Sequence, residues 1–146
     1  MNAGTLNATI EKFGHPATLV REYEHWMVLL RPAQVTLGSL VLAAKGEATA
    51  YGALPAAAFT EQASAVAAIE KALTAFCCYE RINYLMLMMV DPHVHFHVIP
   101  RYSGRREWGG IDFADHGWPG PPELKSAPAL SPRQIRDLRD DLKTYF

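Results

Sequence analysis

Short apolar blocks dominate the first third of the chain and predict strands. Residues 18–31 (TLVREYEHWMVLLR) indicate two strands with a turn near Glu24, and residues 38–44 (GSLVLAA) indicate a third. The links between these blocks are too short to hold crossover helices, so neighbouring strands are expected to pair antiparallel.

The middle of the chain changes to helical spacing. Between residues 60 and 79 the larger apolar side chains recur every three or four positions, at Val66, Ile69, Leu73 and Phe76. Thr60 is the expected N-cap of this helix. Strands are expected again at residues 82–90 and 94–102, with Asp91-Pro92 marking the turn between them.

The rest of the chain divides into a loop and a helix. Residues 103–129 are rich in Gly, Pro and charge and predict a long irregular segment, whose Trp108, Phe113 and Trp118 are expected to pack on the domain. Residues 131–134 (SPRQ) have the form of a capping box with Pro at the first helical position, and predict a helix over 131–146. The order strands, helix, strands, helix predicts one α+β domain over residues 1–146.

Composition narrows the classes of partner. The 146 residues are 49% hydrophobic and 20% charged, which is ordinary for a globular domain, and the formal net charge of −1 gives no general attraction for nucleic acid or an anionic membrane. The first twenty residues lack the apolar core of a secretory signal, and the adjacent Cys77 and Cys78 are poorly placed for a disulfide. A cytoplasmic protein with a small-molecule ligand is expected.

The candidate chemistry lies in residues 91–102 (DPHVHFHVIPRY), which hold three of the six histidines at every second position. Side chains alternate along a strand, so His93, His95 and His97 are expected on one face, roughly 6.6 Å apart. Packing imidazoles side by side costs free energy unless they bind a ligand or take part in catalysis, which makes this row the candidate site. Arg101 continues the same face, where its guanidinium is expected to neutralise phosphate charge.

Three functions fit such a row. Imidazole is the commonest metal ligand, so the histidines are candidate zinc ligands. Alternatively, one neutral imidazole attacks a phosphorus centre while its neighbour donates a proton to the leaving oxygen. The third possibility is a module that binds a nucleotide without catalysis. For the two phosphate-binding functions, Arg31 and Gln34, which lie between two predicted strands, are further candidate contacts.

The stretch His93-Val94-His95-Phe96-His97-Val98-Ile99 resembles the signature His-φ-His-φ-His-φ-φ (φ apolar) of the histidine triad (HIT) superfamily of nucleotide hydrolases and transferases. The order of strands and helix upstream of it is also similar, so the resemblance covers residues 13–102 and suggests a divergent, bacterial-type member. It implies a HIT-like fold with a roughly five-stranded antiparallel sheet and one long central helix, commonly as a homodimer. Residues 103–129 lie outside the general family pattern.

The resemblance also implies roles for the histidines. His95, the middle histidine, would attack the α-phosphorus of a dinucleoside polyphosphate or nucleoside phosphoramidate and carry a nucleotidyl group. His97 would assist the leaving group, and His93 would hold the hydrogen-bond order of the row; no metal or cofactor is required. Two departures stand out: residues 88–92 replace the Gly-Gln that many members have before the triad, and Ser39 stands where a further histidine is common.

Overall fold

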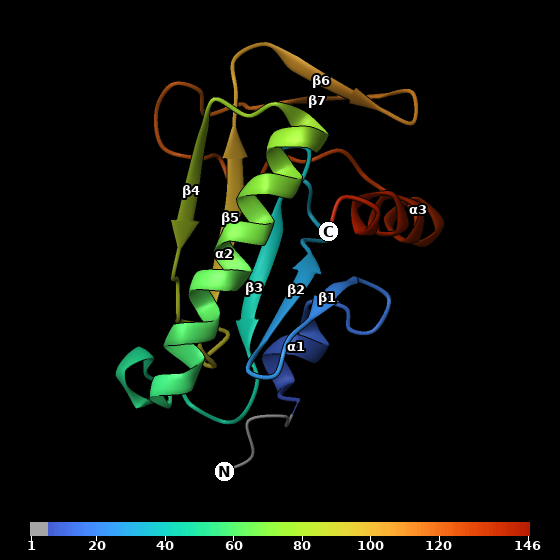
Figure 1. Cartoon of the computed structure of the whole chain (residues 1–146). Coiled ribbons are helices and arrows are strands. Elements are labelled where there is room, and N and C mark those ends of the chain that lie inside the picture. The colour runs from blue at the N-terminus through green and yellow to red at the C-terminus, as the bar shows by residue number, and fades with distance from the viewer. Residues whose placement is uncertain (1–5) are drawn as a thin grey trace.

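In the computed structural model, which describes residues 6–146, five strands form one antiparallel sheet in the order β1-β2-β3-β5-β4 (Figure 1). The strands are β1 (Leu19–Glu22), β2 (Trp26–Leu30), β3 (Leu40–Ala44), β4 (Arg81–Leu85) and β5 (His95–Arg101). The predicted α+β class with a five-stranded antiparallel sheet is confirmed.

Two helices lie on opposite faces of this sheet (Figure 1). The long helix α2 (Ala56–Cys77) packs Ile69 and Leu73 against alternate strand residues such as Leu42, in the larger core. The short helix α1 (Ala8–Lys12) packs Ile10 against the intervening residues, among them Val41, in a smaller second core. The period of two along each strand thus divides the sheet into an α2 face and an α1 face.

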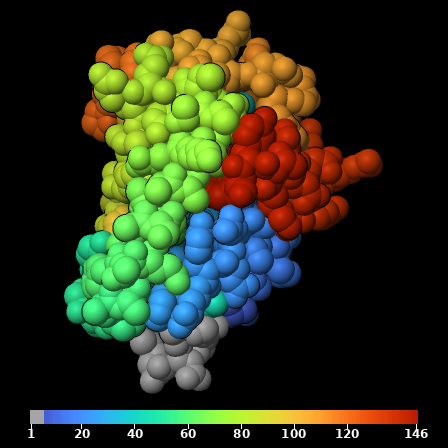
Figure 2. Space-filling view, in the orientation of Figure 1, coloured from blue at the N-terminus to red at the C-terminus, as the bar shows by residue number. Residues whose placement is uncertain are grey.

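The C-terminal helix α3 (Pro132–Lys143) begins as the sequence predicts. The Ser131 hydroxyl accepts from the Gln134 backbone N–H, and the Gln134 side chain accepts in return from the Ser131 N–H, which completes the capping box. Buried Leu138 and Leu142 join the larger core, and Figure 2 shows α3 beside α2 on the surface. None of the helices within residues 6–146 is long and apolar enough to cross a membrane.

The largest differences between predicted and observed ends are at the start of α2 and the end of β4. Helix α2 begins at Ala56, with Pro55 as N-cap, so the prediction of Thr60 as N-cap is wrong. The alanines before Thr60 are strong helix formers and extend the helix by a turn. Strand β4 ends at Leu85, and Met89 and Val90 are 87% and 83% exposed. The apolar run 86–90 therefore extends beyond the sheet, in spite of its strand-like composition.

The segment after β5 is more regular than predicted. It forms a hairpin of β6 (Arg105–Trp108) and β7 (Ile111–Ala114), so the expectation of an irregular segment over 103–129 is wrong in this part. The turn is Gly109-Gly110, with φ of +59° and +77°, a conformation that glycine adopts without steric cost. Phe113 is 1% exposed, which confirms that this segment packs on the domain.

Candidate functional site

Strand β5 carries two of the three histidines on one face of the sheet. His95 and His97 lie two residues apart, with ring centroids 5.2 Å apart and ring planes at 79°. Their partners in the register of β3 are Ala43 and Val41, which belong to the core under α1. Because opposite residues of an antiparallel pair share a face, both imidazoles lie on the α1 face. The prediction that His95 and His97 share one face of the sheet is confirmed.

His93 lies outside the strand, in the bend before β5. The predicted regular spacing of all three histidines along one strand is therefore wrong at this position, because Pro92 offers no N–H to a strand ladder. The His93 ring is held between the Thr9 hydroxyl, 2.9 Å from Nδ1, and the Glu47 carboxylate, 3.3 Å from Nε2. Its side chain thus links the bend to α1, while its carbonyl group faces His95.

The hydrogen bonds of His95 fix its tautomer. Nδ1 lies 2.7 Å from the carbonyl oxygen of His93, and since a carbonyl can only accept, Nδ1 carries the proton. The lone pair is then on Nε2. The side chain is fully buried, and across residues 6–146 Nε2 finds no hydrogen-bond partner. A buried nitrogen lone pair without a partner is energetically costly, and it is also what a nucleophile requires.

The hydrogen bond from Arg31 fixes the tautomer of His97. Its Nε–H donates to His97 Nδ1 over 3.2 Å, and its Nη1 donates to the Ala33 carbonyl over 2.7 Å. The proton of His97 is therefore on Nε2. Burial, with the charge of Arg31 and the neighbouring His95 ring adding to it, lowers the pKa of His97 to about 4. His97 is neutral at pH 7 and offers one N–H as a hydrogen-bond donor.

This low pKa predicts a pH-dependent loss of stability through His97. The folded imidazole takes up a proton near pH 4 and the unfolded one near pH 6.5, so the stabilisation present above pH 6.5 is lost as the pH falls between these values. At pH 5 the free energy of unfolding should be lower by about 2 kcal/mol through this group. Urea unfolding at pH 7, 6 and 5 measures the loss.

The matched variant is His97→Asn, whose Oδ1 atom can still accept from Arg31 but does not titrate. We expect its stability to fall less than that of the wild type over the same pH range. A second variant, His116→Asn, removes an exposed imidazole outside the site and should follow the wild type. Parallel curves for wild type and His97→Asn would show that His97 protonates equally easily in both states.

Phe13, just after α1, covers the two strand histidines. Its ring centroid lies 5.6 Å from that of His95 and 5.5 Å from that of His97. Neither α1 nor Phe13 was predicted from the sequence. The available signal was Asn7, a good N-cap, whose side chain accepts from the Ile10 N–H over 2.9 Å.

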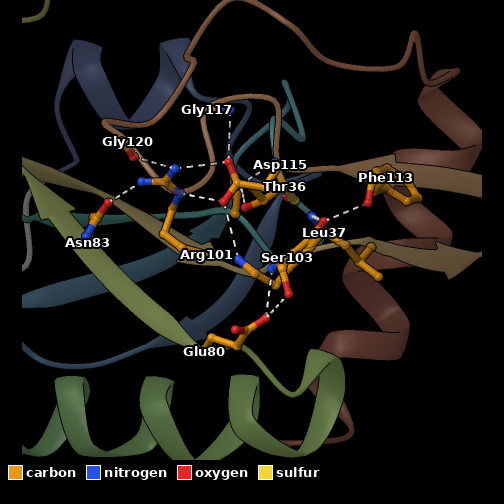
Figure 3. A network of polar contacts seen from close by, with 12 residues as sticks. Thr36, Leu37, Glu80, Asn83, Arg101, Ser103, Phe113, Asp115, Gly117 and Gly120 are labelled. Carbon is orange, nitrogen blue, oxygen red and sulfur yellow. Dashed lines mark hydrogen bonds and ion pairs between the residues drawn. The ribbon is translucent and has the colours of Figure 1, made fainter.

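Arg101 is buried at the far end of β5, and its guanidinium binds within the protein (Figure 3). It donates to both carboxylate oxygens of Asp115, over 2.6 and 3.1 Å, to the Asn83 side chain over 2.8 Å and to the Gly120 carbonyl over 2.9 Å. The predicted contact of Arg101 with phosphate is therefore not supported. This arginine instead fastens the segment after β7 to the sheet.

Gln34 is likewise occupied by its own loop. Its side-chain amide donates to the carbonyls of Arg31 and Ser39, both over 2.7 Å, and accepts from the Gly38 N–H over 2.9 Å. The side chain is fully buried. The predicted role of Gln34 in substrate binding is therefore corrected to shaping the β2–β3 loop. Of the three predicted substrate contacts, the structure places Arg31 beside the histidines.

No protein-family model matches the chain, and no curated protein matches its sequence. Solved structures do match. A histidine triad protein from Sinorhizobium meliloti has a TM-score of 0.74 at 18% identity, and one from Bradyrhizobium japonicum has a TM-score of 0.72 at 17% identity. Each alignment covers 97% of this chain and 96% of the other. The chain has the histidine triad fold.

Within the HIT fold, this chain departs from the family pattern at Ser39. The hydroxyl is fully buried and donates to the Thr36 carbonyl over 2.7 Å, so the residue that replaces the frequent histidine closes a turn. A zinc-bound histidine triad family protein from Mycobacterium smegmatis also matches, with a TM-score of 0.52 at 18% identity over 88% of both chains.

Proposed function

We propose that this chain is a nucleotide hydrolase or nucleotidyl transferase of the histidine triad type, with His95 as the nucleophile. Its substrates would be nucleoside phosphates joined to a leaving group, such as dinucleoside polyphosphates or nucleoside phosphoramidates. The observation that carries the proposal is the Nε2 atom of His95. It is buried and without a partner among the described residues, and its lone pair is fixed in place by the bond of Nδ1 to the His93 carbonyl.

In the first step the Nε2 lone pair of His95 attacks the α-phosphorus. A phosphorus–nitrogen bond forms as the bond to the leaving group breaks, and the departing group takes the electron pair. It leaves as a polyphosphate anion or, from a phosphoramidate already protonated on its nitrogen, as ammonia. The imidazole becomes positively charged, and the His93 carbonyl stabilises this charge through the Nδ1–H. Water then attacks the phosphorus and loses a proton to the solvent, the phosphorus–nitrogen bond breaks with its electron pair returning to Nε2, and a nucleoside monophosphate is released with His95 neutral again.

His97 and Arg31 would act on the leaving group. With Arg31 on Nδ1, the remaining N–H of His97 is at Nε2, where it can donate a hydrogen bond to the bridging atom as charge develops there. A neutral imidazole is a weak acid, and the pKa of about 4 keeps His97 in that form at pH 7. The pair therefore suits leaving groups that depart as stable anions, such as polyphosphates.

The alternative of a metal site built from all three histidines is less well supported. The ring of His93 binds Thr9 and Glu47, and Nδ1 of His95 binds a carbonyl, so these nitrogens do not converge on one point. The Arg31 guanidinium on His97 would also repel a cation. Within residues 6–146, the donor cluster close enough for an ion is Glu24, His25 and Glu61, away from the triad.

Intact-mass spectrometry tests the proposal directly. The protein is mixed briefly with adenosine 5′-phosphoramidate or diadenosine tetraphosphate in EDTA and kept at neutral or alkaline pH. We expect a mass gain of one adenylyl group in the wild type and no gain in His95→Ala. The control variant His116→Ala, which removes an exposed histidine outside the site, should show the same gain as the wild type. Homodimer formation and a cytoplasmic location stay predictions that this experiment does not address.

Each other outcome favours a different function. AMP binding without an adduct and without turnover of either substrate would support the non-catalytic module. Turnover that EDTA abolishes and added zinc restores would support a metal-dependent mechanism instead, and would relate this chain to its zinc-bound structural neighbour.

A further inference from the structure

A cavity of about 450 Å³ opens beside the far ends of β4 and β5. Its walls are Arg81 and Asn83 from β4, Arg101 from β5, and the turn 118–121 that begins with Trp118. This volume lies within the range of small-molecule sites. The turn belongs to the segment between β7 and α3.

The cavity shares a sheet face with the catalytic histidines. In the β4–β5 register Leu85 is opposite His97, Asn83 is opposite Ile99 and Arg81 is opposite Arg101. Opposite residues of an antiparallel pair share a face, so Asn83 and Arg81 lie on the histidine face. The four residues from His97 to Arg101 correspond to roughly 13 Å of strand. The histidines and the cavity therefore lie on one face of the sheet, about that distance apart.

The polar groups of the cavity suit phosphate oxygens. Arg101 holds the Oδ1 atom of Asn83, so the amide nitrogen of that side chain is oriented as a donor. Arg81 is exposed, and its Nη1 donates to the Glu80 carbonyl over 2.8 Å. The Glu80 carboxylate accepts from the N–H and hydroxyl of Ser103. Among the ion pairs of residues 6–146, Arg81 takes part in none, so its charge is available to a ligand.

The opposite wall suits a planar ring. Trp118 is half-buried, and its backbone N–H donates to the Asp115 carbonyl over 3.2 Å. The Gly120 carbonyl next to it accepts from Arg101. The backbone of this turn is thus held by the same buried network that fixes Asn83, and the indole of Trp118 lines the cavity. Indole faces stack on nucleobases. The Arg101 guanidinium contacts the donor wall at Asn83 and the Trp118 turn at Gly120.

We propose that this cavity is the leaving-group subsite of the histidine site, where a planar ring stacks on Trp118 and the phosphates attached to it bind Arg81 and Asn83. The inference rests on the proposed function at His95. It narrows the substrate class to nucleotides whose leaving half is itself a nucleotide, joined by a polyphosphate long enough to reach along β4. The neutral state of His97 agrees with a polyphosphate leaving group.

Two substrates that share the adenylyl half separate the subsite from the chemistry. The leaving group of diadenosine tetraphosphate is ATP, and that of adenosine 5′-phosphoramidate is ammonia, which cannot reach the cavity. Arg81→Ala should raise the KM for diadenosine tetraphosphate about tenfold, since it removes a charge-assisted hydrogen bond. Turnover of the phosphoramidate should stay unchanged, and Arg105→Ala, which removes another exposed arginine, should alter neither. An equal change for both substrates, or none, would overturn the subsite.

Binding in the His95→Ala background makes the result independent of turnover. Calorimetry with ATP should show an affinity about tenfold weaker when Arg81→Ala or Trp118→Leu is added, through the lost phosphate bond or ring contact. Weaker ATP binding in both variants supports the subsite even if the wild type turns over neither substrate, a result that would contradict the proposed chemistry alone. Unchanged ATP binding in both overturns the subsite whatever the turnover.

Discussion

Asp115→Ala is expected to lower the free energy of unfolding by about 3–5 kcal/mol, because it leaves the charge of a buried partner without compensation. The side chains of Arg101 and Asp115 are 4% and 1% exposed, and the carboxylate receives two bonds from the guanidinium. It also accepts from the backbone N–H groups of Tyr102 and Gly117. The substitution removes all four bonds and leaves the buried Arg101 guanidinium without its carboxylate partner.

The control variant replaces an exposed aspartate of β7, the strand that directly precedes Asp115. Asp112 pairs with Arg105 over 3.4 Å, but the two side chains are 57% and 70% exposed. Asp112→Ala should therefore change stability by no more than about 0.5 kcal/mol. Urea unfolding of both variants at pH 7 makes the comparison. A similar loss in both, or none in either, would mean that the Arg101 network does not fasten the segment after β7 to the sheet.

This network shows where sequence reasoning stops. The period-two pattern places Arg101 correctly on the histidine face, since alternation is a local property of the strand. Its partner Asp115 comes from a segment whose hairpin was not recognised, although the Gly109-Gly110 pair between strand-like residues was a usable signal. Without knowledge of Asp115, the sequence offered no partner for the charge of Arg101, and a phosphate ligand was therefore predicted.

The same limit applies around the histidines. The motif predicts the shared face of His95 and His97, and the capping box predicts the start of α3, because both depend on residues close in sequence. The tautomer of His97 depends on Arg31, 66 positions away, and the cover of the site depends on Phe13. Arg31 and Gln34 looked equally suitable from the sequence. Loop geometry separates them, since the Gln34 amide is used entirely within the β2–β3 loop.

The structure gives the three histidines different surroundings, and under the proposed function this difference predicts the largest effect on activity. His95→Ala should reduce the turnover of diadenosine tetraphosphate by a factor of about 10³ or more, since it removes the proposed attacking atom. His93→Ala keeps the backbone carbonyl that binds His95 and loses contacts to Thr9 and Glu47. We expect the turnover of this variant to fall about ten- to a hundredfold, which is typical when a residue that orients a reacting group is removed.

Chemical rescue separates lost chemistry from lost structure. Free imidazole can occupy the space left in His95→Ala, attack the α-phosphorus and pass the adenylyl group to water, so added imidazole should restore part of the turnover of that variant. In His93→Ala the His95 nucleophile is present, and imidazole should have little effect. Circular dichroism confirms that both variants fold. Equal losses in the two variants, with no rescue of His95→Ala, would mean that the unpaired Nε2 atom of His95 is not the nucleophile.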